Sequence, residues 1–387
     1  MQGEETAEFL KHATAAPPLR SAKIQRNVGR LAWNDNKDLK DFKVAISHQP
    51  IKMIARILDP PVLYYQDRTV PTRDGRWNLR DQPKFCNAKP IQSWAILYFQ
   101  APASSSRDCD DALSRLRKNL PSHLRRHGIE IGPPSMVEKA DIQRDKGEVI
   151  NAFGQRVTLA NNNIRPTLFV VLLPSEDATM YGDIKRACEI DFGLATQCLN
   201  LRKLLSQKSL DQYLSNVAMK INAKLGGQNV MIRDPWLESH RAMIIGADMS
   251  RPRRGEVGTQ SVLAICGSFD RGCQRYTMTT GLQDEADGIA KHFSPMVKEL
   301  LTRYVSSQKD GKPPSSILYF RDGISEDQYD SVLEKEYEQL KRKFGVLIAC
   351  IPLTTLQVCI PRARSPSSSA QNVITRACSP SCPRMVT

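Results

Sequence analysis

The chain has 387 residues, of which 41% are apolar, and it carries 55 Lys and Arg against 41 Asp and Glu. The apolar fraction excludes a wholly disordered chain, and the length accommodates two or three domains with cores of their own. The net charge of +14 and the pI near 9.3 favour a polyanionic partner such as nucleic acid, with an ordinary basic protein as the alternative.

Neither a membrane span nor a signal peptide is evident. No apolar run is long enough to cross a bilayer, and the sequence MQGEETAEFLKHA lacks the apolar core of a signal peptide. The ten cysteines are scattered singly, as with Cys188, Cys198 and Cys266, which indicates buried thiols in a reduced intracellular protein. The one close pair, CSPSC at 378–382, has no second pair or histidine nearby, so zinc is not expected there.

The first half of the chain predicts a layered α/β domain. The apolar strand SWAILYF at 93–99 is followed by a helix over 110–128. RPTLFVVLLP at 165–174 is apolar on both faces, as strands of a parallel sheet are. Helices are predicted over 180–193 and 214–227, the second ending in Gly-Gly as helix C-termini often do. This alternation of strands and helices is typical of a Rossmann-like fold.

A second unit begins at the strand AMIIGAD, residues 242–248. Two further strands follow at short intervals within 261–282, as in an antiparallel meander. A helix over 289–307 and a strand at 315–323 complete the unit, and this order is that of an RNase H-like fold. Residues 354–387 contain many Ser, Pro and Arg and no acid, and we expect this tail to be disordered.

One carboxylate and one group of basic residues stand out as candidate functional groups. Asp248 ends an apolar strand, where a carboxylate is costly to bury unless it is paired or holds a cation; it either caps a turn or binds a metal. Lys220 and Lys224 lie four residues apart, as do Tyr181 and Lys185, so each pair lies on one helix face.

Lysines with the amide of Gln197 would form a phosphate cradle, and the ring of Tyr181 would offer a face for a base to stack on. A solvated lysine face is the ordinary alternative, and spacing alone does not decide between the two.

Four blocks of the sequence, FGLATQCLN, MKINAKLGGQN, IIGADMSRP and YFRDGISEDQY, resemble the signature blocks of Argonaute proteins, in the same order. The resemblance covers about residues 45–350 and is closest to eukaryotic, fungal-like members. It implies a linker-2-like segment over 1–88, a Rossmann-like MID domain over 89–232 and a truncated RNase H-like Piwi domain over 233–353, ahead of the tail at 354–387.

In that family the MID domain holds the 5′-monophosphate of a small guide strand. The resemblance implies that Tyr181 stacks on the first base and that the phosphate is held by Lys185, Gln197, Lys220 and Lys224. It also implies that the loop PSEDATM at 174–180 touches the edge of that base, so that Glu176 and Asp177 influence which base is preferred.

Asp248 and Asp322 resemble the first two catalytic aspartates of the Piwi domain. The chemistry needs carboxylates close together, because two Mg²⁺ ions must be bridged while one activates water and the other stabilises the leaving oxygen. The resemblance therefore implies that Asp248 and Asp322 are both catalytic residues and metal ligands.

The sequence departs from the family at the remaining ligands. The position of the family's loop glutamate falls on Gly288, with Glu285 and Asp287 displaced from it. No His follows His292, and no Asp or Glu follows Glu338, so the fourth ligand is missing. We therefore expect a weakly held Mg²⁺ and a nuclease that is impaired or absent.

The leading hypothesis is a cytoplasmic protein, with the nucleus as a second location, that binds a guide RNA and a complementary target RNA in RNA-mediated gene silencing. One alternative is a Mg²⁺-dependent guide-directed endoribonuclease in which Glu285 or Asp287 supplies the missing ligand. A second is a protein-interaction module that docks tryptophan-bearing silencing partners. A third is a non-functional product, shortened at both ends by a gene-model error.

Overall fold

The computed structural model describes most of residues 8–352. The residues in that range that it does not describe are 11–12, 48, 52–53, 55–56, 74, 101–105, 207–209, 236–240, 251–259, 284–292, 325–327, 338–339 and 341–346. The predicted disordered tail at 354–387 lies outside the described residues. The chain divides into two compact units, Met1–Leu58 and Asp59–Thr387.

In the described part of the N-terminal unit, helices α2 (Pro17–Leu31) and α3 (Lys37–Asp41) are joined by a 3-10 turn. Two prolines open α2, where their missing N–H groups cost nothing. Asn36 caps α3, since its side chain accepts the N–H of Leu39 at 3.1 Å. None of the residues of α2 is buried.

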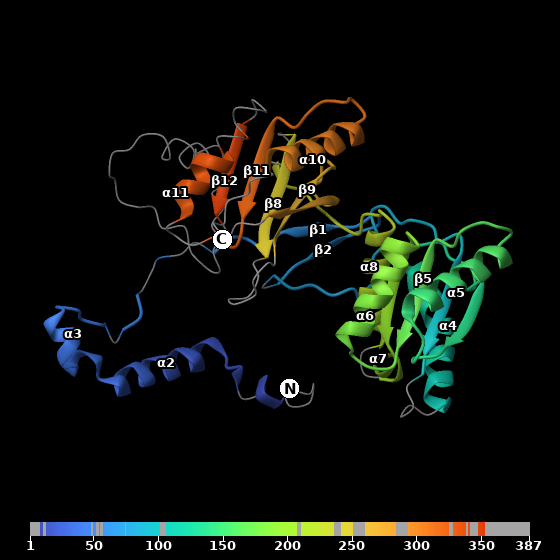
Figure 1. The fold of residues 1–387 in the computed structure, drawn as a ribbon, viewed down its shortest axis with the longest axis horizontal. Coiled ribbons are helices and arrows are strands. Elements are labelled where there is room, and N and C mark those ends of the chain that lie inside the picture. The colour runs from blue at the N-terminus through green and yellow to red at the C-terminus, as the bar shows by residue number, and fades with distance from the viewer. Residues whose placement is uncertain are drawn as a thin grey trace. The chain divides into compact units, whose positions relative to one another are not determined.

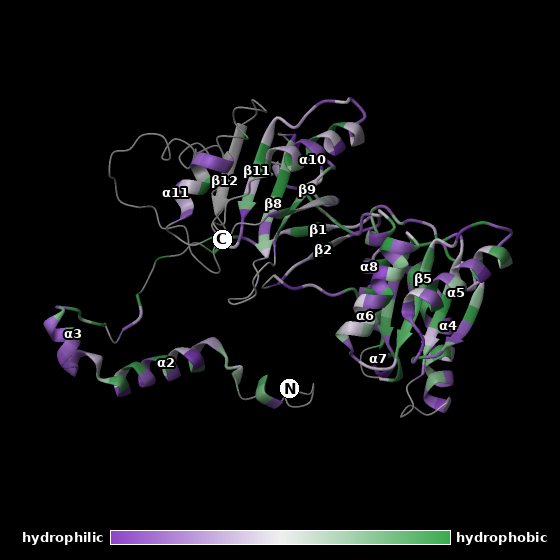
Figure 2. Ribbon diagram, in the orientation of Figure 1, coloured by the Kyte–Doolittle hydropathy of each residue, from purple (hydrophilic) through white to green (hydrophobic). Residues whose placement is uncertain are grey.

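A parallel four-stranded sheet forms the centre of the first part of the larger unit. Its strand order is β4-β3-β5-β6, with bounds Met136–Ala140, Trp94–Phe99, Leu168–Leu173 and Ala195–Asn200. Every residue of β5 is buried, as its continuous apolar sequence predicted, and the central strands are the most apolar part of this sheet (Figure 2).

Helices cover both faces of this sheet and produce a three-layer α/β/α arrangement (Figure 1). One face packs against α4 (Ser106–Arg126), the short α7 (Leu201–Leu205) and α8 (Leu210–Lys224). The other face packs against α5 (Lys146–Ala160) and α6 (Ala178–Lys185). The predicted Rossmann-like layers are therefore present, and the helix containing Lys220 and Lys224 ends before its Gly-Gly sequence, as expected.

A three-stranded antiparallel sheet, β2-β1-β7, brings together segments far apart in the chain; its strands are Thr69–Pro71, Val62–Tyr64 and Met231–Ile232. The fully buried Asn222 of α8 reinforces this connection, since its amide donates to the carbonyl of Asn87 at 3.1 Å and to the side chain of Asn229 at 2.9 Å.

The second domain contains a five-stranded sheet of order β10-β9-β8-β11-β12. The strands are Tyr276–Gln283, Ser261–Ser268, Ala242–Ser250, Ser316–Arg321 and Leu347–Pro352. The first three strands in the chain pair antiparallel, whereas β11 pairs parallel with both β8 and β12. Helix α10 (Phe293–Ser307) packs on one face around Met243, Ile245 and Leu263. This is the predicted order of meander, helix and strand.

The described cysteine thiols are all free. Cys188 is buried as expected, but Cys198 and Cys266 are only half-buried, because each lies on a strand at a position with one partly open face. Among the described helices, none is both long enough and apolar enough to cross a membrane.

Candidate nucleic-acid interface

Three of the four predicted phosphate-binding residues, Lys185, Gln197 and Lys224, meet at the edge strand of the four-stranded sheet. Lys185 is the last residue of α6 and Lys224 is the last residue of α8. The ammonium groups of Lys185 and Lys224 donate to the same acceptor, the carbonyl oxygen of Thr196 in β6, at 3.0 Å and 2.5 Å. Cations are also favoured at helix C-termini, where backbone carbonyls lack partners. We call Lys185, Thr196, Gln197 and Lys224 the lysine site.

Gln197 fixes one of these ammonium groups. Its side chain is buried, and its Oε1 accepts a hydrogen bond from the Lys224 Nζ at 3.0 Å. The Nε2 of the same amide donates to the carbonyl of Cys198 at 2.8 Å, which sets the orientation of the amide. An amide held in this way directs its oxygen at the lysine and leaves its second N–H for another acceptor.

The lysine site is poorly solvated. Lys224 is exposed as a residue, but its ammonium end lies against the sheet, and burial of that end lowers its pKa to about 8, with the charge of Lys185 acting in the same direction. Burial likewise raises the pKa of the Cys188 thiol to about 12 and that of the Cys198 thiol to about 11. Charges interact more strongly in such surroundings than in bulk water.

Two groups that contact Lys185 were not predicted from the sequence. One is the Thr196 carbonyl, for which a sequence offers no signal. The other is Glu189, whose carboxylate forms an ion pair with Lys185 one turn later. Glu189 lies on a π turn, Arg186–Asp191, that continues α6. The four-residue spacing from Lys185 to Glu189 was visible in the sequence and could have identified the pair.

Tyr181 and Lys220 lie one turn before Lys185 and Lys224 on the same two helices. Both side chains are exposed, with 46% of Tyr181 open to solvent. The structure therefore joins Lys185, Gln197 and Lys224 through hydrogen bonds and places the other two predicted residues on the adjoining turns, outside those hydrogen bonds.

The two acids of the preceding loop already have protein partners. Asp177 caps α6, because one of its oxygens accepts the N–H groups of Thr179 and Met180 at 2.9 Å and 3.0 Å. Glu176 forms an ion pair with Lys203 at 3.2 Å. An influence of Asp177 on base preference would thus act through the helix it caps.

The two aspartates of the second domain lie opposite one another. Ala247 of β8 is the register partner of Arg321 in the parallel strand β11, and the N–H of Asp322 donates to the carbonyl of Ala247 at 2.9 Å. Asp248 follows Ala247 within β8, Asp322 is the first residue after β11, and both are exposed. Register partners of neighbouring strands point to the same face of a sheet. We call these two residues the aspartate pair.

Gly323 turns the chain beside this pair. It has a positive φ of 72°, and a Cβ built on it would lie 3.1 Å from an Oδ1 of Asp248. Only glycine adopts this conformation without strain. The backbone directly after Asp322 therefore passes close to the carboxylate of Asp248.

A buried ion pair supports the aspartate pair from the opposite face of β11. Arg321 and Glu336 are both fully buried, and the Arg321 Nε lies 3.2 Å from a Glu336 oxygen. The hydroxyl of Tyr319 donates to the same carboxylate at 2.6 Å. The Arg321 guanidinium also donates to the backbone carbonyl of Asp322. Arg321 therefore connects a buried carboxylate to the backbone of a predicted metal ligand.

Asp248 does not end its strand as expected, because β8 continues to Ser250 and stays paired with β9. The donor set still suits one hard divalent cation, because carboxylates on β8 and directly after β11 supply the oxygen ligands that Mg²⁺ prefers. Within the described part of the chain, no cluster of three or more His, Cys, Asp or Glu side chains could hold a metal. Four positions considered for the remaining ligands lie outside the described residues: Glu285, Asp287, Gly288 and His292.

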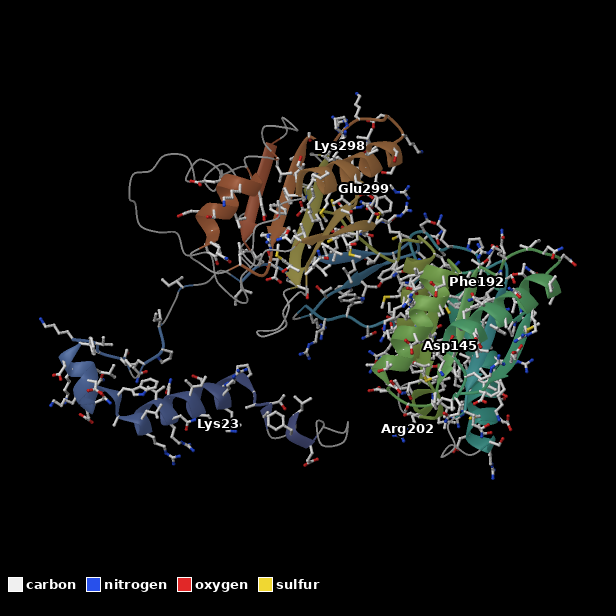
Figure 3. The ribbon with its side chains drawn as sticks, viewed as in Figure 1. Lys23, Asp145, Phe192, Arg202, Lys298 and Glu299 are labelled. Carbon is white, nitrogen blue, oxygen red and sulfur yellow. The ribbon has the colours of Figure 1, made fainter. Side chains whose placement is uncertain are left out.

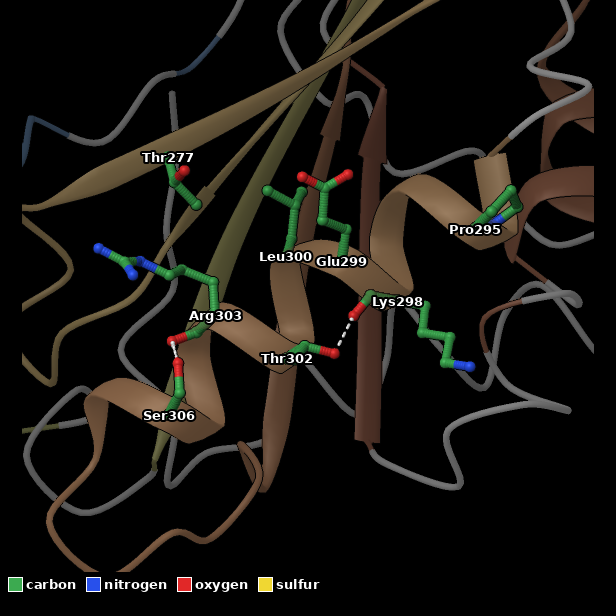
Figure 4. Close-up of a pocket in the computed structure, with 8 residues that line it drawn as sticks. All are labelled: Thr277, Pro295, Lys298, Glu299, Leu300, Thr302, Arg303 and Ser306. Atoms are coloured by element: carbon green, nitrogen blue, oxygen red, sulfur yellow. Dashed lines mark hydrogen bonds between the residues drawn. The ribbon is translucent and has the colours of Figure 1, made fainter.

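A pocket of about 490 Å³ lies on α10 beside Thr277 of β10 (Figure 4). The two hydroxyl groups that α10 contributes are bonded to their own helix: Thr302 donates to the carbonyl of Lys298 at 2.9 Å, and Ser306 to that of Arg303 at 3.0 Å. None of the residues that line it belongs to the lysine site or the aspartate pair.

The chain is similar to Argonaute proteins over most of its length. Residues 168–358 match the Piwi domain family. Rice Protein argonaute 1B (Oryza sativa subsp. japonica) is 29% identical over 376 residues, which are 88% of this chain and 32% of that protein. The chain spans about a third of the length of the curated relatives it matches.

Two solved structures show the same fold. The MID and Piwi domains of N. crassa QDE-2 match with a TM-score of 0.58 at 23% identity, over 70% of this chain and 75% of that one. Kluyveromyces polysporus Argonaute with a guide RNA matches with a TM-score of 0.64 at 23% identity, over 77% of this chain and 36% of that one.

The fold is a Rossmann-like MID domain followed by an RNase H-like Piwi domain, as the sequence predicted. The chain therefore resembles Argonaute proteins in sequence and in fold, and its residues 168–358 match the Piwi domain family.

We expect Glu336→Gln to lower the free energy of unfolding by about 3–5 kcal/mol, because it leaves the buried Arg321 charge without its counter-ion. Glu334→Gln, on the same turn but exposed, is the matched control and should change stability little. Urea unfolding of the two variants and the parent measures the difference. Equal midpoints for the two variants would contradict the role assigned to the ion pair.

Proposed function

We propose that the protein binds a small guide RNA by its 5′-phosphate and uses it to engage complementary target RNA in gene silencing. The observation that carries this proposal is the convergence of Lys185 and Lys224 on the Thr196 carbonyl. Each ammonium has three N–H donors, so each retains donor capacity beyond its protein contacts. An anion at this point would accept charge-assisted hydrogen bonds from both.

The surroundings of the lysine site suit the end of a nucleic-acid strand. Lys220 lies on the exposed turn before Lys224 and adds a third positive charge within reach of a phosphate. The exposed ring of Tyr181 lies on the turn before Lys185, where a base following the phosphate would stack on it. The net charge of +14 favours association with a polyanion. A guide RNA is also present in the similar Kluyveromyces polysporus structure.

We further propose that Asp248 and Asp322 hold a Mg²⁺ ion near the backbone of the target strand. Bound there, the ion would supply positive charge to a phosphodiester. The two aspartates would orient it through their carboxylates, with Arg321 fixing the backbone of Asp322. Two carboxylates leave most of the coordination sphere to water, so the ion is weakly held. Guide-directed RNA cleavage is the second candidate function, and the aspartate pair is the observation that favours it.

The phosphate contacts are tested by replacing Lys220 and Lys224 together with Ala. Each charge-assisted contact contributes about 1.5–3 kcal/mol, so the double variant should lose the preference for a 5′-phosphorylated 21-mer RNA over the same RNA with a 5′-hydroxyl. Replacing the exposed Lys298 and Lys312 with Ala removes equal charge elsewhere (Figure 3 labels Lys298) and should preserve the preference. If the parent protein binds both RNA ends equally, the proposed function is wrong.

The affinity for a 5′-phosphorylated strand should fall above pH 8. Burial lowers the pKa of Lys224 to about 8, so this amine is mostly neutral at higher pH in the free protein. A bound phosphate dianion would stabilise the charged ammonium. Binding at higher pH therefore requires Lys224 to take up a proton. Linkage then limits the fall to about tenfold per pH unit. Lys224→Arg keeps its charge throughout this range and should remove the fall. Fluorescence anisotropy between pH 6.5 and 9.5 measures both proteins, and a parallel decline in the two would refute the assignment.

We expect no efficient cleavage of target RNA. Two carboxylates fix one ion poorly, and misplacing the attacking water by about 1 Å can slow a reaction on the order of a hundredfold. A single-turnover assay with a 5′-phosphorylated guide, a complementary target, and Mg²⁺ or Mn²⁺ provides the measurement. Cleavage opposite the middle of the guide that disappears in Asp248→Ala would establish the endoribonuclease instead, with Glu285 or Asp287 as candidates for the missing ligand.

A further inference from the structure

A carboxylate already occupies part of the lysine site. Glu189 forms an ion pair with Lys185, and the Lys185 side chain is 17% exposed against 41% for that of Glu189. The same ammonium donates to the Thr196 carbonyl at 3.0 Å. Two of the three N–H donors of Lys185 are therefore directed at protein oxygens. A 5′-phosphate that is to interact fully with Lys185 must compete with Glu189.

The charges at the site show why this competition matters. Lys185 and Lys224 together carry up to two positive charges, and Glu189 carries one negative charge. A phosphate monoester carries about −1.5 to −2 near neutral pH. With Glu189 in place, a bound dianion leaves these four groups with a net negative charge of about one. Lys220, on the exposed turn before Lys224, offsets this charge only in part, because solvent screens it. With Glu189 turned away, the lysines and the phosphate balance. Like charges in a poorly solvated site repel strongly.

The backbone that carries Glu189 is held firmly by the packing around it. The π turn buries Ala187 and Cys188 against the domain core. Phe192, just after the turn, packs on α5 so closely that a Cβ at Gly154 would lie 2.4 Å from its ring (Figure 3 labels Phe192). The Phe192 N–H donates to the carbonyl of Ala187 at 2.9 Å. Rotation of the half-exposed Glu189 side chain is therefore the simplest way to clear Lys185.

We propose that Glu189 is an internal counter-ion of the lysine site, which a 5′-phosphate must displace from Lys185 and which therefore lowers the affinity of the site for that phosphate. This inference rests on the proposed function, because it concerns the same phosphate site. Glu189 neutralises Lys185 while the site is empty and opposes the ligand while it is filled. It sets the affinity for phosphorylated ends and limits occupation of the site by other anions.

The test compares Glu189→Gln with Asp191→Asn. Both variants remove one negative charge from the same turn, but Asp191 is exposed and does not take part in the Lys185 contacts. The probes are a 21-mer RNA with a 5′-phosphate and the same RNA with a 5′-hydroxyl, each measured by fluorescence anisotropy at pH 7. We expect Glu189→Gln to bind the phosphorylated RNA about tenfold more tightly than the parent does, with a much smaller gain for the hydroxyl RNA. Asp191→Asn should raise both affinities slightly and equally.

Three other outcomes of the binding test would each contradict a specific part of the proposal. If Glu189→Gln and Asp191→Asn have the same effect, only the general charge of the surface matters and the counter-ion is refuted. If Glu189→Gln weakens phosphate binding, Glu189 positions Lys185 and does not compete with the ligand. If the parent protein itself fails to distinguish the two RNA ends, the proposed function fails and this inference fails with it. Melting temperatures of both variants equal to that of the parent exclude misfolding as a cause.

Discussion

Two ammonium groups share one backbone carbonyl at the edge of the first sheet, and the arrangement of the lysine site depends on that contact. Lys185 and Lys224 end two helices that cover opposite faces of the sheet. The edge strand β6 is where the ends of these helices meet, and the Thr196 carbonyl lies between them. The repulsion of two cations in a poorly solvated place is reduced by the carbonyl, by Gln197 and by Glu189. The positive charge that remains makes an anion a favourable ligand.

The fold was largely predictable because its main elements follow from local patterns. The apolar run of β5 and the three short strands from β8 to β10 are visible in the sequence, and both pairs of predicted residues at four-residue spacing lie on helices. Thr196 and Glu336 were not predictable, since their contacts depend on which elements become neighbours. An arginine within an apolar strand is costly to bury without a counter-ion. Choosing Glu336 from the acids of the following turn requires the structure.

The aspartate pair depends on a contact of a different kind. The register of β8 and β11 brings the end of β11 beside Asp248. Asp322 lies one residue beyond β11, where register no longer fixes the backbone. The Arg321 guanidinium does so by holding the carbonyl of Asp322, and its own position depends on Glu336 and Tyr319. A buried ion pair of this kind contributes little net stability, because desolvation offsets attraction. Its contribution here is to restrict the position of one carboxylate relative to the other.

The two sites carry surplus charge of opposite sign, and they therefore respond differently to a nucleic acid. The positive charge of the lysine site favours an anion directly, and in the proposed complex the affinity would depend on the ionisation of the phosphate and of Lys224. The aspartate pair repels the phosphodiester backbone unless a cation lies between them. The proposed binding of a guide end would thus require no metal, whereas close approach of a strand to Asp248 and Asp322 would. The charges proposed for the two tasks lie on separate sheets and have separate buried supports, so divergence of the proposed metal ligands would leave the lysine site intact.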